Sequence, residues 1–177
     1  MSVLVTYASK YGSTAELAEH VAGFVRGAGR QAEVLPVEKV GDVSSYDAVL
    51  LGSAVYFGHW MKAALKFARR EEGLKDRPVW LFSSGPLGPS TLPGGKLEEA
   101  APEEAAELDA SLHPRNHAVF YGRLEHRRLG LAHRALTLLP AARATLPEGD
   151  FRDWPAVEEW AMAVGRELSE SPAEGER

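Results

Sequence analysis

The chain has 177 residues, enough for one domain with a substantial core. Its formal net charge of -5 argues against a general nucleic-acid binder, and the absence of cysteine excludes disulfides, Cys-ligated zinc, iron–sulfur clusters and thiol catalysis. The sequence shows no basic leader and no run of roughly 20 apolar residues, so we expect a cytoplasmic protein without a signal peptide or a membrane span.

The first predicted elements are a strand at residues 3–7, a polar loop and a helix at 15–25. The loop contains hydroxyls, one lysine and one glycine, but no carboxylate. A helix N-terminus offers unpaired N–H groups and partial positive charge, which suits a phosphate. An ordinary turn with Ser13 or Thr14 as N-cap is the alternative. The spacing fits neither a Walker loop nor the Rossmann fingerprint. The candidate phosphate-binding residues are Ser9, Lys10, Tyr11, Gly12, Ser13 and Thr14.

Further strands are predicted at residues 32–37, 48–52, 79–82 and 118–121. The run at 48–52 is apolar throughout, which is typical of a strand buried on both faces of a parallel sheet. An aromatic loop at 53–60 and a helix at 61–72 follow it, and a loop rich in Ser, Gly and Pro at 83–89 follows the next strand.

The remaining segments are expected to be mostly helical. Residues 96–112 are rich in Ala and Glu and predict a partial helix, and the basic segment 123–143 has apolar residues at helical spacing. Asp153 is the predicted N-cap of a last helix, and residues 169–177 are predicted to be a tail. No linker divides the chain, so we predict a single domain at 1–168.

Strands that alternate with helices predict an α/β three-layer fold, with a five-stranded parallel sheet in the order 2-1-3-4-5. Ligands of such sheets bind at the carboxyl ends of the strands, where the loops after strands 1, 3 and 4 converge. A phosphate loop beside an aromatic loop favours a flat, phosphorylated ring such as FMN. Response-regulator receivers share this topology but need acidic residues where this chain has Tyr7, Ala8, Gly52 and Ser53. The missing carboxylates therefore exclude a receiver, although the fold would allow one.

The motifs at residues 7–14 and 52–59 and the late Asp153-Trp154 resemble the flavodoxin superfamily, and more closely the flavodoxin-domain family that includes menaquinone-dependent protoporphyrinogen oxidase. The resemblance implies a flavodoxin-like fold and FMN as cofactor, with the phosphate held at residues 9–14. It further implies that the flavin ring is flanked by Ala54, Val55, Tyr56, Phe57, Gly58, His59, Ser84, Gly85, Pro86 and Leu87.

Two functions stay open. One is an FMN-dependent oxidoreductase that passes electrons from an organic substrate to a quinone-type acceptor, and the other is a flavodoxin-type electron carrier without its own substrate. The chain departs from the oxidase in the basic segment 125–134, which has no Tyr or Trp, so its substrate is not fixed. The partners considered are a small-molecule substrate or quinone, a redox partner protein and a second copy of the chain. Membrane contact through 123–143 is the alternative to its leucines docking on the sheet.

Several side chains allow two interpretations. Tyr56 and Phe57 either stack on the flavin or pack beside a strand end, and His59 either acts as the catalytic residue near the flavin or caps the following helix. Lys10 either contacts the phosphate or is solvated. The histidines lack metal-ligand spacing, so no metal is predicted. Because neither flavin-flanking loop contains Asp or Glu, we expect a less negative potential for the second electron than in acidic carrier flavodoxins.

Overall fold

A parallel sheet forms the centre of the computed structural model, which describes residues 1–89, 97–129 and 147–170. Its order is β2 (Gln31–Pro36), β1 (Ser2–Ala8), β3 (Ala48–Tyr56), β5 (Val79–Ser84) and β6 (Asn116–Phe120). A short strand, β4 (His59–Trp60), pairs antiparallel with β3 off this path. Once β4 is set aside, the long strands have the predicted order 2-1-3-4-5, so the predicted sheet is confirmed.

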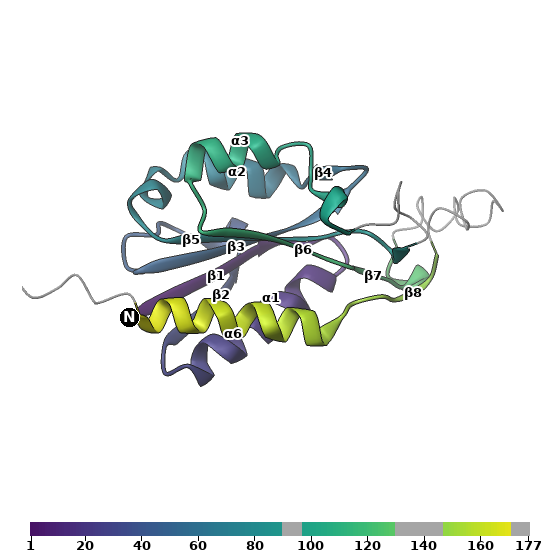
Figure 1. Cartoon of the computed structure of the whole chain (residues 1–177). Helices are drawn as coiled ribbons and strands as arrows, with labels where there is room; N and C mark the ends of the chain where they lie inside the picture. Colours follow the sequence, from purple (N-terminus) through teal and green to yellow (C-terminus); the bar gives the residue numbers. More distant parts are fainter. Residues whose placement is uncertain (90–96, 130–146, 171–177) are drawn as a thin grey trace, which may run out of the picture.

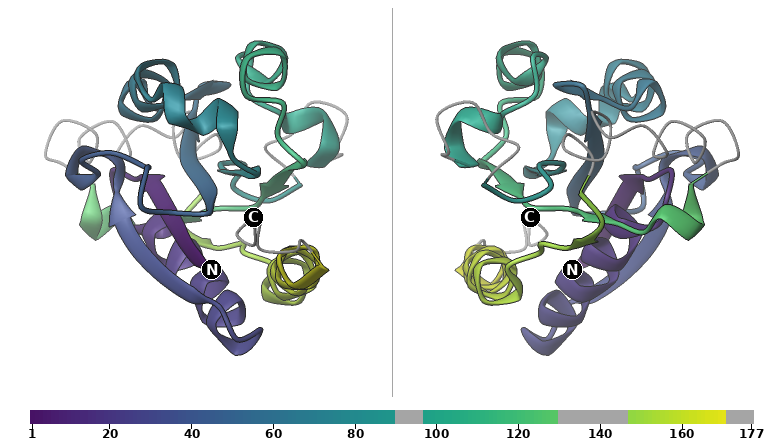
Figure 2. Two further views of the ribbon diagram at one scale, coloured as in Figure 1. Left: turned by 90° about the vertical axis from the view of Figure 1, so that its left-hand side faces the viewer. Right: turned by 90° about the vertical axis from the view of Figure 1, so that its right-hand side faces the viewer.

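Helices cover both faces of the sheet. The helices α1 (Ser13–Gly27) and α6 (Trp154–Glu170) lie on one face, and α2 (Lys62–Arg70) and α3 (Ala105–Leu112) lie on the other (Figure 1). The two end-on views show the same three layers, with the sheet between the helix pairs (Figure 2). Short 3-10 turns are η1 (Val37–Lys39), η2 (Glu72–Asp76), η4 (Leu97–Ala100) and η5 (His126–Arg128), and a small second sheet pairs β7 (Arg123–Leu124) with β8 (Gly149–Asp150).

Strand β3 shows why the chain needs both helical layers. Its side chains alternate between two apolar clusters: Val49 and Leu51 pack toward α2 and α3, and Ala48 and Leu50 pack toward α1 and α6. All four are fully buried. Burying a valine or leucine side chain stabilises the fold by about 1.5–3 kcal/mol, so the apolar run requires cover on both sides.

Three boundaries differ from the sequence-based expectation. β3 continues to Tyr56 instead of ending at residue 52, because it pairs with β4 across a tight turn. Residues 123–128 form β7 and η5, so the helix predicted over 123–143 is wrong for these residues. Backbone pairing with β8 replaces helical hydrogen bonds at β7. The rest of that prediction lies outside the described residues, as does most of the predicted tail. Of the predicted helical stretch 96–112, the structure describes residues 97–112, and there only η4 and α3 are helical.

The caps of the two long helices have different outcomes. Asp153 Oδ1 accepts a hydrogen bond from the Ala156 N–H at 3.2 Å, which confirms Asp153 as the N-cap of α6. Helix α1 instead has Gly12 as its N-cap, and no side chain caps it. The capped-turn interpretation of Ser13 and Thr14 is therefore wrong. No helix in the described part of the chain is long and apolar enough to span a membrane.

Candidate cofactor site

Three loops leave the sheet at one edge. Strands β1, β3 and β5 are parallel neighbours, and the register pairs Ala8 with Ser53 and Ala54 with Ser84 near their carboxyl ends. The loop 9–14, the turn after Tyr56 and the loop after Ser84 therefore start side by side, on the side of the molecule where β7 and β8 lie (Figure 1). This is where an open α/β sheet binds its ligand.

The first loop leaves a buried hydroxyl unpaired. Gly12 has a φ of 89°, and its N–H donates to Ser9 Oγ at 3.1 Å. Ser13 Oγ accepts a hydrogen bond from the Arg123 N–H at 3.1 Å. Thr14 is fully buried, and its Oγ1 has no hydrogen-bond partner among the described residues. A buried hydroxyl without a partner costs stability, and at a helix N-terminus it suits an incoming phosphate oxygen.

Aromatic rings link the first and second loops. Tyr11 meets Tyr56 edge-on, with the ring centroids 6.2 Å apart. Burial, reinforced by Tyr11, raises the pKa of Tyr56 to about 12, so Tyr56 is a neutral hydrogen-bonding phenol at physiological pH. Lys10 is exposed and places its Nζ 5.4 Å from the centroid of the Tyr11 ring. The loops 9–14 and 54–60 thus form one continuous surface.

The second loop is a tight hairpin turn that presents an aromatic ring to solvent. Tyr56 pairs with His59, and the two residues between them, Phe57 and Gly58, have φ angles of 53° and 82°. Two positive φ values in a two-residue loop are typical of a type I′ turn, which normally holds Asn or Gly. A phenylalanine in this conformation costs roughly 1–2 kcal/mol, yet Phe57 is 94% exposed and gains no packing. A ring held at such a cost is available to cover a flavin.

His59 is paired with acids from a distant segment. Its Nδ1 lies 2.9 Å from Glu104 Oε1, and its Nε2 lies 3.6 Å from Glu103 Oε1. Glu104 Oε2 also accepts from the Trp60 N–H at 3.2 Å, and the Glu103 N–H donates to the Gly58 carbonyl at 2.9 Å. The hydrogen bond that His59 donates to Glu104 and the charge of Glu103 raise the pKa of His59. His59 does not cap α2, so the capping interpretation is wrong.

These acids remove the basis of the redox expectation. The carboxylates of Glu103 and Glu104 lie against the second loop, although neither residue belongs to a flavin-flanking loop in sequence. Two carboxylates beside one imidazole leave a net negative charge at the candidate ring site, whether or not the imidazole is protonated. The absence of Asp and Glu from the loops themselves therefore does not predict a less negative second potential.

Close backbone packing shapes the third loop. A Cβ on Gly85 would lie 2.7 Å from Val55 Cβ, so only glycine fits between the second and third loops. The Gly85 N–H donates to the Phe120 carbonyl at 3.2 Å, and the Gly122 N–H donates to the Pro86 carbonyl at 2.9 Å. Ser84 is buried, and Gly85, Pro86 and Leu87 are half-buried. The predicted residues of this loop therefore reach the same edge as the other two loops.

A buried polar cluster anchors the base of the second loop. Trp60 Nε1 donates to Ser83 Oγ at 2.7 Å, and His117 Nε2 lies 2.9 Å from the same oxygen. Ser53 Oγ accepts from the Met61 N–H at 3.0 Å. Burial lowers the pKa of His117, and the weaker charge of Asp109 opposes this shift. These contacts fix where β4 leaves β3.

The structure adds an arginine cluster that the sequence does not reveal. Glu16, in the first turn of α1, forms ion pairs with Arg123, with Arg152 at 2.8 Å and with Arg128 at 3.6 Å. Arg152 is only 3% exposed. Burial alone would raise the pKa of Glu16, but hydrogen bonds from Arg152 and Arg123 outweigh it and lower that pKa. No short-range pattern signals these contacts, because the partners are far apart in sequence.

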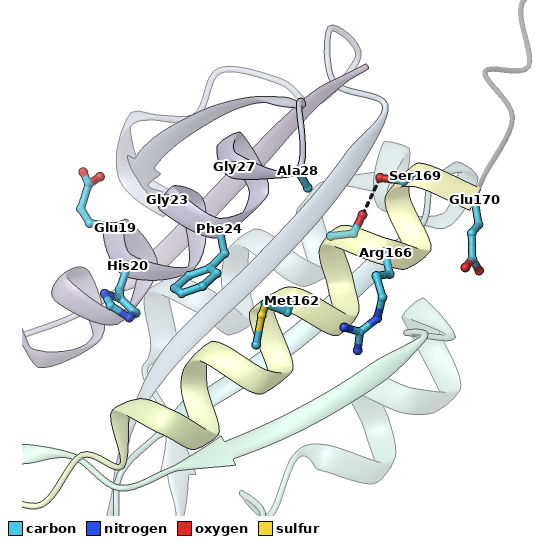
Figure 3. A pocket seen from close by; sticks show the side chains of 11 residues that line it. Glu19, His20, Gly23, Phe24, Gly27, Ala28, Met162, Arg166, Ser169 and Glu170 are labelled. Carbon is cyan, nitrogen blue, oxygen red and sulfur yellow. Dashed lines mark hydrogen bonds between the residues drawn. The ribbon is translucent and has the colours of Figure 1, made fainter.

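Of two surface grooves, one lies away from the three loops and the other borders the second loop. One, of about 840 Å³, runs between α1 and α6 and is lined by residues such as His20, Phe24, Met162 and Arg166 (Figure 3). Its lining comes from the parts of both helices that are remote from the loops, so it is not the candidate cofactor site. The other, of about 910 Å³, follows α2 from His59 to Arg70 and adjoins the second loop. No group of three His, Asp or Glu within the described ranges could hold a metal ion.

Comparison with known proteins matches this arrangement. The open parallel sheet with helices on both faces defines a doubly wound α/β fold. The model of the flavodoxin domain family matches residues 4–140. The chain therefore belongs to the flavodoxin-domain family. It is 23% identical to protoporphyrinogen IX dehydrogenase [quinone] of Escherichia coli strain K12, covering 97% of this chain and 98% of that protein.

Solved structures share the fold. Rubredoxin oxygen:oxidoreductase of Desulfovibrio gigas superposes with a TM-score of 0.61 and 13% identity over 95% of this chain, which spans only 36% of that longer protein. Flavodoxin 1 of Bacillus cereus superposes with a TM-score of 0.58 and 16% identity, covering 98% of this chain and all of that one. The family implies a flavin, and the unpaired Thr14 hydroxyl, the aromatic second loop and the glycine-lined third loop fit one.

Proposed function

We propose that this protein binds FMN across the three loops and acts as an FMN-dependent oxidoreductase that passes electrons from an organic substrate to a quinone-type acceptor. The observation that carries the cofactor assignment is the fully buried, unpaired Thr14 hydroxyl at the N-terminus of α1, beside the loop that holds Tyr56 and Phe57. That combination suits a ligand with a phosphate at one end and a flat ring at the other.

Each loop has its own part in binding. Ser9 and Thr14 contribute hydroxyls and residues 9–14 contribute backbone N–H groups to the phosphate, while the positive φ of Gly12 keeps the loop free of a side chain there. Phe57 and Tyr56 provide ring surfaces, and the tightly packed Gly85 provides backbone beside them. The bound FMN supplies one-electron and two-electron chemistry.

His59 is the proposed proton-handling residue. Its ring is half exposed at the rim of the second loop, and its raised pKa keeps the ring protonated up to a higher pH than for a free imidazole. Glu104 holds Nδ1, and among the described residues Nε2 has the longer contact to Glu103. A proton held at Nε2 can therefore be exchanged with a substrate or with solvent at this rim.

The substrate side of the proposal rests on the second groove and on the curated relative. The groove along α2 adjoins His59 and Trp60, which gives an organic substrate an apolar surface next to the second loop. The Escherichia coli relative, which this chain covers almost completely, is named for the oxidation of protoporphyrinogen IX with a quinone. A porphyrinogen-like substrate and a quinone acceptor are therefore the first pair to test.

An electron carrier without its own substrate is the alternative. The 94% exposed Phe57 at the tip of the hairpin turn, with acidic Glu103 beside it, favours this alternative. An exposed apolar tip with flanking charge suits docking to a redox partner protein. This alternative uses the same FMN site and differs only in what meets the flavin edge.

Two measurements test the proposal in sequence. Titration with FMN should give saturable quenching of flavin fluorescence, and an absence of saturable binding would refute the cofactor assignment. The FMN-loaded protein should then oxidise protoporphyrinogen with a quinone under steady-state conditions. If it only stimulates electron transfer from a flavodoxin reductase to a protein acceptor, the carrier alternative replaces the oxidoreductase.

A further inference from the structure

Arg128 lies directly over the first loop. A Cβ built on Gly12 would be 3.1 Å from Arg128 Nη1, so the guanidinium occupies the space beside the N-cap of α1. Arg128 comes from η5, after the last strand of the main sheet, and its side chain is 43% exposed. The fold thus brings a cation from a late segment to a loop that has only Lys10 as a cation of its own.

The ion pairs of Arg128 are the longest in its cluster. Its Nη1 is 3.6 Å from Glu16 and its Nε is 3.4 Å from Glu125. Both acids have closer partners, since Arg152 is 2.8 Å from Glu16 and Arg127 is 2.7 Å from Glu125. Arg128 can therefore turn toward a new anion without leaving either carboxylate unpaired.

The charge of the cluster is compatible with an anion. Glu16 alone would repel a phosphate at the start of α1, but Arg123 and Arg152 neutralise it. Among the described residues that pair with one another here, three carboxylates face four guanidinium groups: Glu16, Glu125 and Asp150 against Arg123, Arg127, Arg128 and Arg152. Glu148, whose charge also acts on Arg127, balances the fourth guanidinium, so the cluster as a whole does not repel an anion, and it is Arg128 whose Nη1 would lie 3.1 Å from a Cβ on Gly12.

We propose that Arg128 is a phosphate-binding residue of this chain, which pairs with the dianionic phosphate of FMN held by residues 9–14 and so selects FMN over riboflavin. A planar guanidinium offers two parallel N–H donors to phosphate oxygens, which adds direction as well as charge. The inference rests on the proposed FMN site, and on two independent observations: the unpaired Thr14 hydroxyl and the position of Arg128 over Gly12.

Flavin titrations of matched variants test this role. FMN and riboflavin are titrated separately into the full chain, Arg128→Gln and Arg127→Gln, with fluorescence quenching as the readout. Arg127 is the control because it sits one residue earlier in η5, is exposed, and forms its ion pair among the described residues with Glu125. Arg128→Gln should weaken FMN binding about tenfold or more, as expected for a lost hydrogen bond to a charged group. Its riboflavin affinity and the FMN affinity of Arg127→Gln should stay unchanged.

Salt and a conservative variant sharpen the comparison. Raising the ionic strength should weaken FMN binding more in the full chain than in Arg128→Gln, because the variant lacks the screened ion pair. Arg128→Lys keeps the charge but loses the planar donor pair, so it should recover part of the lost affinity. Thermal melts of each variant without flavin show whether it is folded.

Each other outcome has a distinct meaning. If FMN binds the full chain and Arg128→Gln equally well, the role of Arg128 is refuted while the FMN site stands. Equal losses of affinity for FMN and riboflavin would also refute it, because the change would then act on the structure of the loop. An equal loss of FMN affinity in Arg127→Gln would refute it as well, because the effect would then come from the general electrostatic field. If the full chain shows no saturable FMN binding, the proposed function itself fails.

Discussion

Replacing Thr14 by valine should change two properties in opposite directions. Thr14 is fully buried with an unpaired hydroxyl, and such a group costs about 1–3 kcal/mol. Valine has nearly the same shape and a similar helix propensity, so Thr14→Val should stabilise the FMN-free protein by up to that amount. In a chain of this length, each kcal/mol raises Tm by about 2–4 °C. The same change removes a hydrogen bond to the phosphate, which should weaken FMN binding about 10- to 100-fold.

Thr6 provides the matched control. It is also fully buried with an unpaired hydroxyl, but it lies within β1 and not in the loop. It shares a face of β1 with Leu4 and Ala8, which pack toward α2, whereas Thr14 belongs to α1 on the other face. Thr6→Val should therefore raise Tm without changing FMN affinity.

Calorimetry of the FMN-free variants and fluorescence titration with FMN measure the two effects. A lower Tm for Thr14→Val would mean that its hydroxyl is bonded in the free protein, which contradicts the fit argument. An FMN affinity equal to that of the unmodified chain would remove Thr14 from the phosphate site, even if Tm rises.

Three other substitutions test the loops around the site. Phe57→Asn places a residue that accepts positive φ at the hairpin turn, so it should raise stability by about 1 kcal/mol in thermal melts. It should also speed FMN release in stopped-flow measurements, and an unchanged release rate would mean that Phe57 does not cover the ring. Gly85→Ala forces a Cβ to within 2.7 Å of Val55 Cβ and should cost about 1–3 kcal/mol in urea unfolding, so an unchanged midpoint would contradict the close packing. Because burial lowers the pKa of His117 in the folded state, the unfolded chain gains its proton first as pH falls through about 6.5, and stability is lost in that window. His117→Gln can keep the bond to Ser83 and should show a smaller fall in Tm between about pH 7.5 and 5.5, and an equal fall would assign the pH effect to other groups.

The fold could be predicted because its signals are local. An unbroken apolar run at 48–52 indicates a strand with cover on both faces, and the alternation of strands and helices limits the topology. The hairpin turn was missed because Phe57-Gly58 is a weak type I′ sequence, and β4 contains only two residues. The helix predicted from residue 123 is wrong at its start because residues 123–124 pair with β8. The apolar spacing does not reveal this pairing, since β8 lies far along the chain.

The candidate site was predicted only where it is built from strand-end loops. Residues 9–14, 54–59 and 84–87 follow neighbouring strands, so the topology alone brings them to one edge. The pairing of His59 with Glu104, and of Glu16 with Arg152, depends on how distant segments pack. Glu103 and Glu104 were not among the predicted site residues, because the Ala- and Glu-rich pattern of 96–112 does not show which distant loop its acids meet.

The arginine cluster also has a consequence for how the protein matures after synthesis. The loop at residues 9–14 leaves the ribosome before residues 123 and 152, yet Ser13 is held by Arg123, and Glu16 is neutralised by Arg123 and Arg152. Helix α6, which packs on α1, is made later still. A nascent chain that lacks these segments exposes an uncompensated Glu16 beside the candidate phosphate-binding loop. FMN should therefore bind after synthesis of these segments is complete, and not to the growing chain.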